Sequence, residues 1–246
     1  MLTTFDWILA AVLCLGLPVQ ALWTYPRFRR RVASGDPKAR VREYASIFLM
    51  EWTLVAVTFL LWFGQGRDLP GLGLGFANGV KPSSFWITAA VTGILIALLI
   101  LNTRAILRSP EQQKKILESL GSVAELMPHS RHERRWFAAL SVTAGICEEI
   151  LYRGFLLWFC TVLVGVPGAV ALTTLVFGAV HLYQGPTGGL RAAGLGLIMA
   201  LLTVFSGSVW LAMVLHAAAD LTSGKTVSGS LQVQNPAEPG PDPAAG

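Results

Sequence analysis

The chain has 246 residues, of which 53% are hydrophobic and 13% are charged, and its mean hydropathy is +0.57. Soluble domains carry roughly 25% charged residues, so this composition excludes an ordinary soluble protein and places the chain in a lipid bilayer. The net charge of +5 comes from short basic clusters between apolar runs, and no nucleic-acid-binding motif is present. We therefore expect membrane lipid, and no nucleic acid, as a partner.

The predicted fold is all-α: a polytopic membrane helix bundle. Because a spanning helix needs about 20 apolar residues, the chain accommodates about seven to eight helices, including one amphipathic cytoplasmic helix. A single transmembrane domain is expected over residues 1–222, and a disordered C-terminal tail over residues 223–246, which are rich in Pro, Gly, Ser and Ala. The three cysteines lie in apolar runs and are odd in number, which favours buried thiols over disulfides.

The first half of the chain contains three predicted spans and one amphipathic helix. The first span, residues 7–23, follows no basic segment and ends in a cluster of arginines, so it is interpreted as a retained helix and not as a signal peptide. The positive-inside rule places the Lys- and Arg-rich connector 27–42 in the cytoplasm and the N-terminus outside. We therefore expect a multi-pass protein of the cell membrane, with its basic loops and C-terminal tail in the cytoplasm.

Spans two and three are predicted at residues 44–63 and 85–101, joined by a loop rich in Gly and Pro. Glu51 in the second span is interpreted as a snorkelling or paired carboxylate, not a catalytic one. In residues 110–127, apolar and charged positions alternate at helical spacing, which predicts an amphipathic helix on the cytoplasmic side. This helix either rests on lipid or caps the bundle.

The second half contains four more predicted spans, at residues 134–164, 169–183, 192–205 and 209–222, the first two separated by a turn at 165–168. Ionisable side chains interrupt three of them: Glu148, Glu149 and Arg153 in the first, His181 in the second, and His216 with Asp220 in the last. Charged groups inside a membrane are costly and mark functional sites by default. The alternative is that these polar groups join helices by hydrogen bonds, but six such residues in three spans favour a functional cluster.

The spacing within the first group predicts two different tasks for its carboxylates. Glu149 and Arg153 are four residues apart, so they share a helix face and are expected to pair. Glu148 lies about 100° further round the helix and points elsewhere. One carboxylate is thus held by an arginine, and the other is available for chemistry.

These residues carry a resemblance to a known family. Glu-Glu-x-x-x-Arg at 148–153, Phe-x-x-x-His at 177–181 and His-x-x-x-Asp at 216–220 are similar, in type and order, to the three motifs of the CPBP intramembrane proteases. That family, also called Abi, includes the type II CAAX prenyl endopeptidases and bacteriocin-processing or immunity proteins. The resemblance covers about residues 134–222.

The resemblance implies an intramembrane endopeptidase in which Glu148 and His181 activate a water molecule. It also implies that His216 and residue 220 stabilise the oxyanion, while Glu149 and Arg153 support the structure. The chain departs from the family at Asp220, where the usual residue is Asn, because an ionised carboxylate cannot donate a hydrogen bond. We expect Asp220 to orient His216 and favour its protonated form, which leaves His216 as the donor.

Cofactor and substrate follow from the same resemblance. The family has been described both as metalloproteases and as glutamate proteases. No His-Glu-x-x-His motif is present, so metal-independent water activation is favoured here, and zinc held by Glu148, His181 and His216 is the alternative. The expected substrate is a membrane-tethered peptide or lipidated protein, with a prenylated CAAX-type C-terminus as the specific form. The competing functions are a non-enzymatic scaffold or immunity protein on the same fold, and a proton-coupled transporter.

Overall fold

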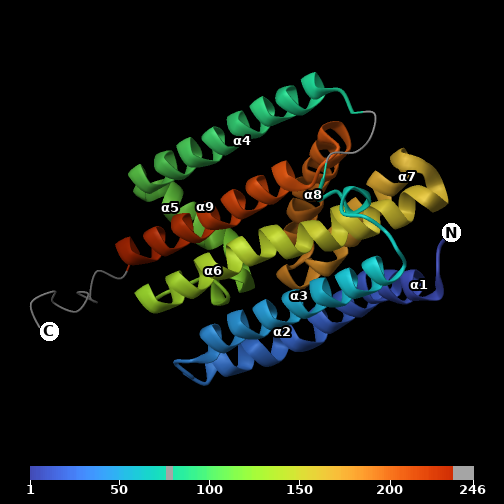
Figure 1. Cartoon of the computed structure of the whole chain (residues 1–246). Coiled ribbons are helices and arrows are strands. Elements are labelled where there is room, and N and C mark those ends of the chain that lie inside the picture. Colours follow the sequence, from blue (N-terminus) through green and yellow to red (C-terminus); the bar gives the residue numbers. More distant parts are fainter. Residues whose placement is uncertain (76–79, 235–246) are drawn as a thin grey trace, which may run out of the picture.

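The computed structural model describes residues 1–75 and 80–234, and these residues form a bundle of helices (Figure 1). The α-helices of the described residues are α1 Thr4–Ala11, α2 Leu17–Ala33, α3 Ala39–Gly64, α4 Pro82–Arg108, α5 Pro110–Leu120, α6 Arg131–Glu148, α7 Leu157–Val180, α8 Pro186–Ser206 and α9 Trp210–Gln234. Two π-helical segments, η1 Val12–Gly16 and η4 Glu149–Leu156, join α1 to α2 and α6 to α7. Short 3₁₀ turns form η2 Pro70–Leu72, η3 Gly121–Glu125 and η5 Leu182–Gln184.

The predicted polytopic membrane bundle is confirmed. Within the described residues, five segments are long and apolar enough to cross a membrane: Thr4–Ala33, Ala39–Gly64, Pro82–Arg108, Arg131–Val180 and Pro186–Ser206. The longest of them changes direction at Gly165, whose φ of 72° and ψ of 170° are non-helical. Pro167 follows, so the segment divides into two helices at the turn expected at residues 165–168.

Helices far apart in sequence lie side by side. Figure 1 shows α4, α9, α6, α3 and α2 stacked in that order, and each of these neighbours is in contact with the next. α7 and α8 pack on each other, and α8 also contacts α4 and α9. Two of the motif-bearing helices, α6 and α9, are therefore neighbours in the middle of this stack, and the third, α7, joins the bundle through α8 and η4.

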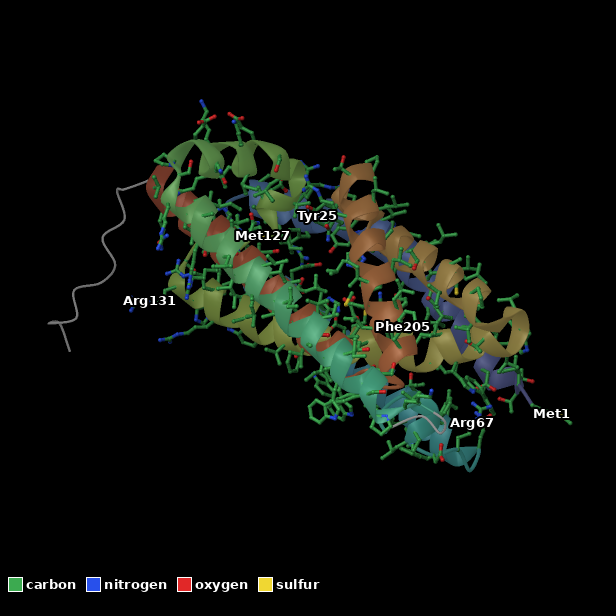
Figure 2. All side chains as sticks on the ribbon, turned by 90° about the horizontal axis from the view of Figure 1, so that it is seen from above. Met1, Tyr25, Arg67, Met127, Arg131 and Phe205 are labelled. Atoms are coloured by element: carbon green, nitrogen blue, oxygen red, sulfur yellow. The ribbon has the colours of Figure 1, made fainter. Side chains whose placement is uncertain are left out.

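Arginines and the amphipathic helix occupy one end of the bundle, which we call the basic end. There Arg29 pairs with Glu125 at 2.9 Å, and the Tyr44 hydroxyl donates to the Leu126 carbonyl at 2.6 Å. Figure 2 places Tyr25, Met127 and Arg131 toward this end and Met1 with Arg67 toward the other. These contacts to α2 and α3 show that the segment after α5 caps the bundle. Residues 110–127 were expected either to rest on lipid or to cap the bundle, and the end of this range does the second.

The opposite end is fastened by a buried ion pair. Both guanidinium Nη atoms of Arg67 donate to the Asp6 carboxylate at 2.7 Å, and Asp6 is 2% exposed. The Arg67 guanidinium also lies over the rings of Trp62 and Trp158. Bidentate geometry and aromatic stacking are the settings in which an arginine pair contributes most.

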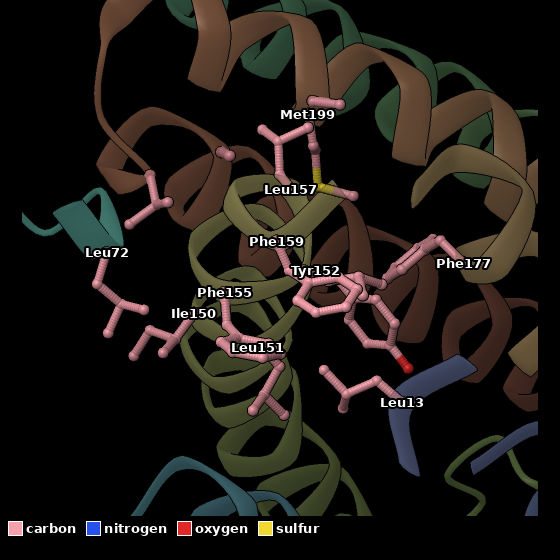
Figure 3. Close-up of a cluster of buried hydrophobic side chains, with 14 of the residues drawn as sticks. Leu13, Leu72, Ile150, Leu151, Tyr152, Phe155, Leu157, Phe159, Phe177 and Met199 are labelled. Carbon is pink, nitrogen blue, oxygen red and sulfur yellow. The ribbon is translucent and has the colours of Figure 1, made fainter. Parts of the chain in front are cut away.

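The main hydrophobic core surrounds η4 and the beginning of α7. Figure 3 shows Tyr152, Phe155 and Phe159 from this segment packed with Phe177 of α7 and Met199 of α8. All five side chains are at most 4% exposed. The segment that carries the first motif is thus held from several sides, which fixes the directions of its polar side chains.

Two predicted boundaries are wrong. The basic connector expected at residues 27–42 is mostly helical, since α2 runs to Ala33 and α3 begins at Ala39. The disordered tail expected from residue 223 does not begin there, because α9 continues to Gln234; residues 235–246 lie outside the described residues. The small residues that suggested disorder instead allow close helix packing: a Cβ on Gly224 would lie 2.5 Å from the Phe137 ring, and one on Gly229 would lie 2.6 Å from Leu107.

Gly145 provides a test of this packing. A Cβ at Gly145 would lie 2.9 Å from the Cβ of Ala217 and 3.0 Å from the Met213 carbonyl of α9. Gly145→Ala should therefore push α6 and α9 apart and lower the free energy of unfolding by about 1–3 kcal/mol. The midpoint of thermal unfolding in detergent measures the effect. Gly93→Ala in α4 is the matched control, because a Cβ there meets nothing within 4 Å; equal melting of both variants would contradict the close approach.

Candidate active site

The two adjacent glutamates lie where α6 passes into the π-helical segment η4. α6 ends at Glu148 and η4 begins at Glu149. Glu149 is fully buried at 0% exposed, whereas Glu148 is half-buried. Single π-helical turns within α-helices occur frequently at functional sites. The two carboxylates therefore have different surroundings, as the helical spacing predicted.

Glu149 is the centre of a buried ionic cluster, which we call the Glu149 cluster (Glu149, Arg153 and His216). Its Oε1 accepts a hydrogen bond from Nη1 of Arg153 at 2.8 Å and another from Nδ1 of His216 at 2.8 Å. All three side chains are at most 5% exposed. The predicted pairing of Glu149 with Arg153 is confirmed, and the contact with His216 is an addition that the sequence did not indicate.

Arg153 extends this cluster to two more helices. Its Nη2 donates to the Gly196 carbonyl of α8 at 3.1 Å, and its guanidinium lies 4.1 Å from the centre of the Phe177 ring in α7. A Cβ on Gly196 would lie 2.9 Å from that Nη2. Gly196 is therefore small because the arginine passes against it.

His216 has a carboxylate beside each ring nitrogen. Nδ1 contacts Glu149, and Nε2 lies 3.8 Å from Oδ2 of Asp220. The second distance is too long for a direct hydrogen bond. Asp220 therefore lies beside Nε2 without a direct hydrogen bond to it.

His181 terminates α7 and has one nitrogen engaged. Its Nδ1 lies 2.8 Å from the Phe177 carbonyl. A carbonyl only accepts, so Nδ1 carries the hydrogen, and Nε2 of the neutral ring keeps a free lone pair. The Phe177 ring lies 4.7 Å from the His181 ring and 5.9 Å from the His216 ring, centre to centre, so one aromatic side chain packs against both histidines.

The four predicted catalytic residues line one cavity of about 350 Å³, which we call the larger cavity. Glu148 comes from α6, His181 from the end of α7, and His216 with Asp220 from α9. Ser119, Leu120 and Val123 of the amphipathic segment also line this cavity. The capping segment at the basic end therefore covers part of the site.

A second, smaller cavity meets the larger one at Glu148. It has a volume of about 110 Å³ and is lined largely by side chains of α2, α3 and η4. Glu51, Glu148 and His181 are among the residues that it shares with the larger cavity. These three side chains thus lie where the two cavities join.

Glu51 is the site residue that the sequence interpretation missed. Of the two roles expected for it, snorkelling or paired, its 4% exposure in the interior of α3 excludes snorkelling. Its carboxyl group is close enough to Glu148 for a side-chain hydrogen bond. The signal was present, because a lone carboxylate in an apolar span is costly wherever it occurs, and the same argument selected Glu148.

Both histidines of the zinc alternative direct the same ring nitrogen into the cavity. Nδ1 of His181 and Nδ1 of His216 are each engaged by a protein acceptor, so Nε2 is the nitrogen left for chemistry in both rings. In the described part of the chain, no group of three His, Cys, Asp or Glu side chains lies close enough together, as placed, to hold a metal ion.

Comparison with known proteins supports the resemblance drawn from the motifs. Residues 131–222 match the family model described as type II CAAX prenyl endopeptidase Rce1-like. No curated protein and no solved structure matches the chain. The matched segment runs from the start of α6 into α9 and contains all three motifs, so the predicted family relationship is confirmed there. Glu51 and the amphipathic helix lie outside it.

The Glu149 cluster makes a prediction about stability. Arg153→Met leaves a buried carboxylate without its arginine, which should cost about 3–5 kcal/mol. Arg29→Met is the matched control, because it breaks an arginine–glutamate pair that is 49% and 31% exposed and should change stability far less, since solvent screens exposed ion pairs. Thermal unfolding of both purified variants compares them. If Arg153→Met melts at the same temperature as Arg29→Met, the cluster does not stabilise the bundle.

Proposed function

We propose that this protein, whose residues 131–222 form an Rce1-like segment, is an intramembrane endopeptidase that hydrolyses a peptide bond of a membrane-tethered substrate. The observation that carries the proposal is the convergence of Glu148, His181, His216 and Asp220 on one cavity inside the bundle. A scaffold role requires no such convergence of a carboxylate and two histidines on one cavity.

Glu148 and His181 activate the attacking water in this proposal. No N–H or hydroxyl group of the described residues donates to Oε2 of Glu148, so this oxygen is available to take a proton. Nε2 of His181 accepts the second hydrogen of the same water. As the water oxygen bonds to the scissile carbonyl carbon, its proton passes to Glu148. Glu148 then returns that proton to the departing amine as the carbon–nitrogen bond breaks.

His216 stabilises the developing oxyanion. With Nδ1 held by Glu149 and Nε2 facing Asp220 across 3.8 Å, the protonated ring presents an Nε2–H donor that the substrate oxygen reaches in the transition state. A pre-oriented donor of this kind stabilises the charge without reorganisation. In this proposal the mechanism is metal-independent, and the chelator experiment below tests it.

Arg191 is the feature of the larger cavity that favours a peptide ending nearby. Three carboxyl side chains line this cavity, Glu51, Glu148 and Asp220, and Arg191 is the one lysine or arginine among its described lining residues. With His216 assigned to the oxyanion, Arg191 is the cation left to bind a free C-terminal carboxylate of the substrate. We infer release of a short C-terminal peptide from a prenylated, CAAX-type protein, with the lipid holding the substrate at the membrane.

Removal of either water-activating group should abolish cleavage. Glu148→Gln and His181→Ala should each lower kcat by at least about 100-fold in protein reconstituted in lipid nanodiscs, measured as tripeptide release from a farnesylated CAAX peptide. Glu111→Gln on the exposed face of α5 is the control and should retain full activity. Wild-type kcat should also survive a strong chelator, and metal analysis should find no stoichiometric zinc.

Other results of this experiment would contradict the proposal. Activity that survives Glu148→Gln would exclude the carboxylate as the base. Loss of activity to a chelator that zinc restores would replace the metal-independent mechanism. No cleavage by wild type, together with proton-coupled flux in liposomes, would identify a transporter instead.

Arg191 tests the type of substrate. Arg191→Met should raise KM about 10-fold or more for a peptide with a free C-terminus, because a charge-assisted hydrogen bond is lost. The same variant should leave KM unchanged for the peptide with a C-terminal amide. Arg104→Met, an exposed change on α4, is the control variant. An equal effect on both peptides would show that Arg191 does not recognise the carboxylate.

A further inference from the structure

Glu51 is a buried carboxyl group that neither the motifs nor the matched segment includes. It lies on α3, is 4% exposed, and lines both cavities at the point where they join. No N–H or hydroxyl group of the described residues donates to its Oε2. A carboxylate placed in an apolar span without a donor is costly, so its presence requires an explanation.

The neighbour that explains it is Glu148. The two carboxyl groups are within hydrogen-bonding reach of each other, and two ionised carboxylates at that distance repel strongly inside a bundle. A hydrogen bond between them requires one proton, carried by one of the pair. His181 lines both cavities with the pair; its Nδ1–H donates to the Phe177 carbonyl, and the proposed mechanism uses its ring as a neutral acceptor. Other ionisable side chains nearby are Asp220 across the larger cavity, Cys147 on α6 and Tyr152 on η4, and none of these three supplies a cation.

We infer that Glu51 is a positioning residue for Glu148, donating a hydrogen bond as a carboxylic acid to one oxygen of the Glu148 carboxylate. The catalytic part of this inference, that Glu148 is the base, rests on the proposed function. The hydrogen bond holds the Glu148 carboxylate in one orientation and leaves its other oxygen for the water. It also keeps the pair at a single negative charge, so that Glu148 remains the base.

The geometry of the elements gives this arrangement a physical basis. Glu148 is the last residue of α6, and α3 packs against both α6 and η4. The Glu149 cluster holds the next residue from the opposite side. Glu148 alone of the two glutamates is exposed to the cavities, and Glu51 is the group that restrains its side chain.

The catalytic test compares three substitutions on α3. Glu51→Gln keeps a neutral donor of the same length and should retain kcat within about 3-fold. Glu51→Leu removes the donor and should lower kcat about 10- to 100-fold with little change in KM, because the base loses its orientation. Thr58→Val is the matched control for a polar-to-apolar change, since Thr58 is 1% exposed and bonds its own helix. Unchanged kcat in Glu51→Leu, or equal losses in the Gln and Leu variants, would overturn the inference.

A second readout does not depend on catalysis. Infrared spectroscopy of the substrate-free protein at neutral pH should show the carbonyl stretch of a protonated, hydrogen-bonded carboxyl group. That band should vanish in Glu51→Gln and persist in Thr58→Val. Absence of the band from wild type, or its persistence in Glu51→Gln, overturns the inference. Failure of wild type to cleave any peptide, with the band present and lost in Glu51→Gln, would refute the proposed function and leave the carboxyl pair established.

Discussion

A charge buried inside the bundle must be neutralised by the groups around it, and in the Glu149 cluster Arg153 and His216 do this for the Glu149 carboxylate. Removing two ions from water costs several kcal/mol each unless their geometry and remaining hydrogen bonds are satisfied. Arg153 achieves this with Glu149, the Gly196 carbonyl and the Phe177 ring. Because these partners come from η4, α8 and α7, and His216 adds α9, satisfying one carboxylate sets the relative positions of four elements.

This constraint also separates the roles of the two glutamates. Glu149 is fully engaged, so the adjacent Glu148 is left facing the cavities with a partner of a different kind, the carboxyl of Glu51. The close approach at Gly145 brings α9 against α6, and the contact between His216 and Glu149 depends on it. Glu149, which supports the structure, and Glu148, to which we assign the chemistry, are therefore consecutive residues whose side chains point in different directions from the helix.

How much of the structure could be predicted from the sequence depends on how far apart along the chain the interacting residues lie. The spans are visible in hydropathy, and the Glu149–Arg153 pair is visible because four residues separate its members. The contact between Glu149 and His216 joins residues 67 positions apart. The contact between Glu51 and Glu148 depends on how α3 and α6 are aligned along their lengths. No local sequence pattern indicates how these helices are aligned. The end of α9 was missed because Gly and Ser serve equally in disordered tails and in tightly packed membrane helices.

The N-terminal half of the chain, which lies outside the matched segment, contributes to the site itself. α3 supplies Glu51, and the amphipathic segment supplies Ser119, Leu120 and Val123 to the larger cavity. These elements also change the electrostatic balance around residue 220. An amide at that position would add a donor beside His216, whereas Asp220 adds a third carboxyl group to the cavity. The inferred restriction of the Glu51–Glu148 pair to one charge, together with Arg191 at the wall, lets this cavity accommodate the extra carboxyl group, and the proposed mechanism assigns oxyanion stabilisation to His216.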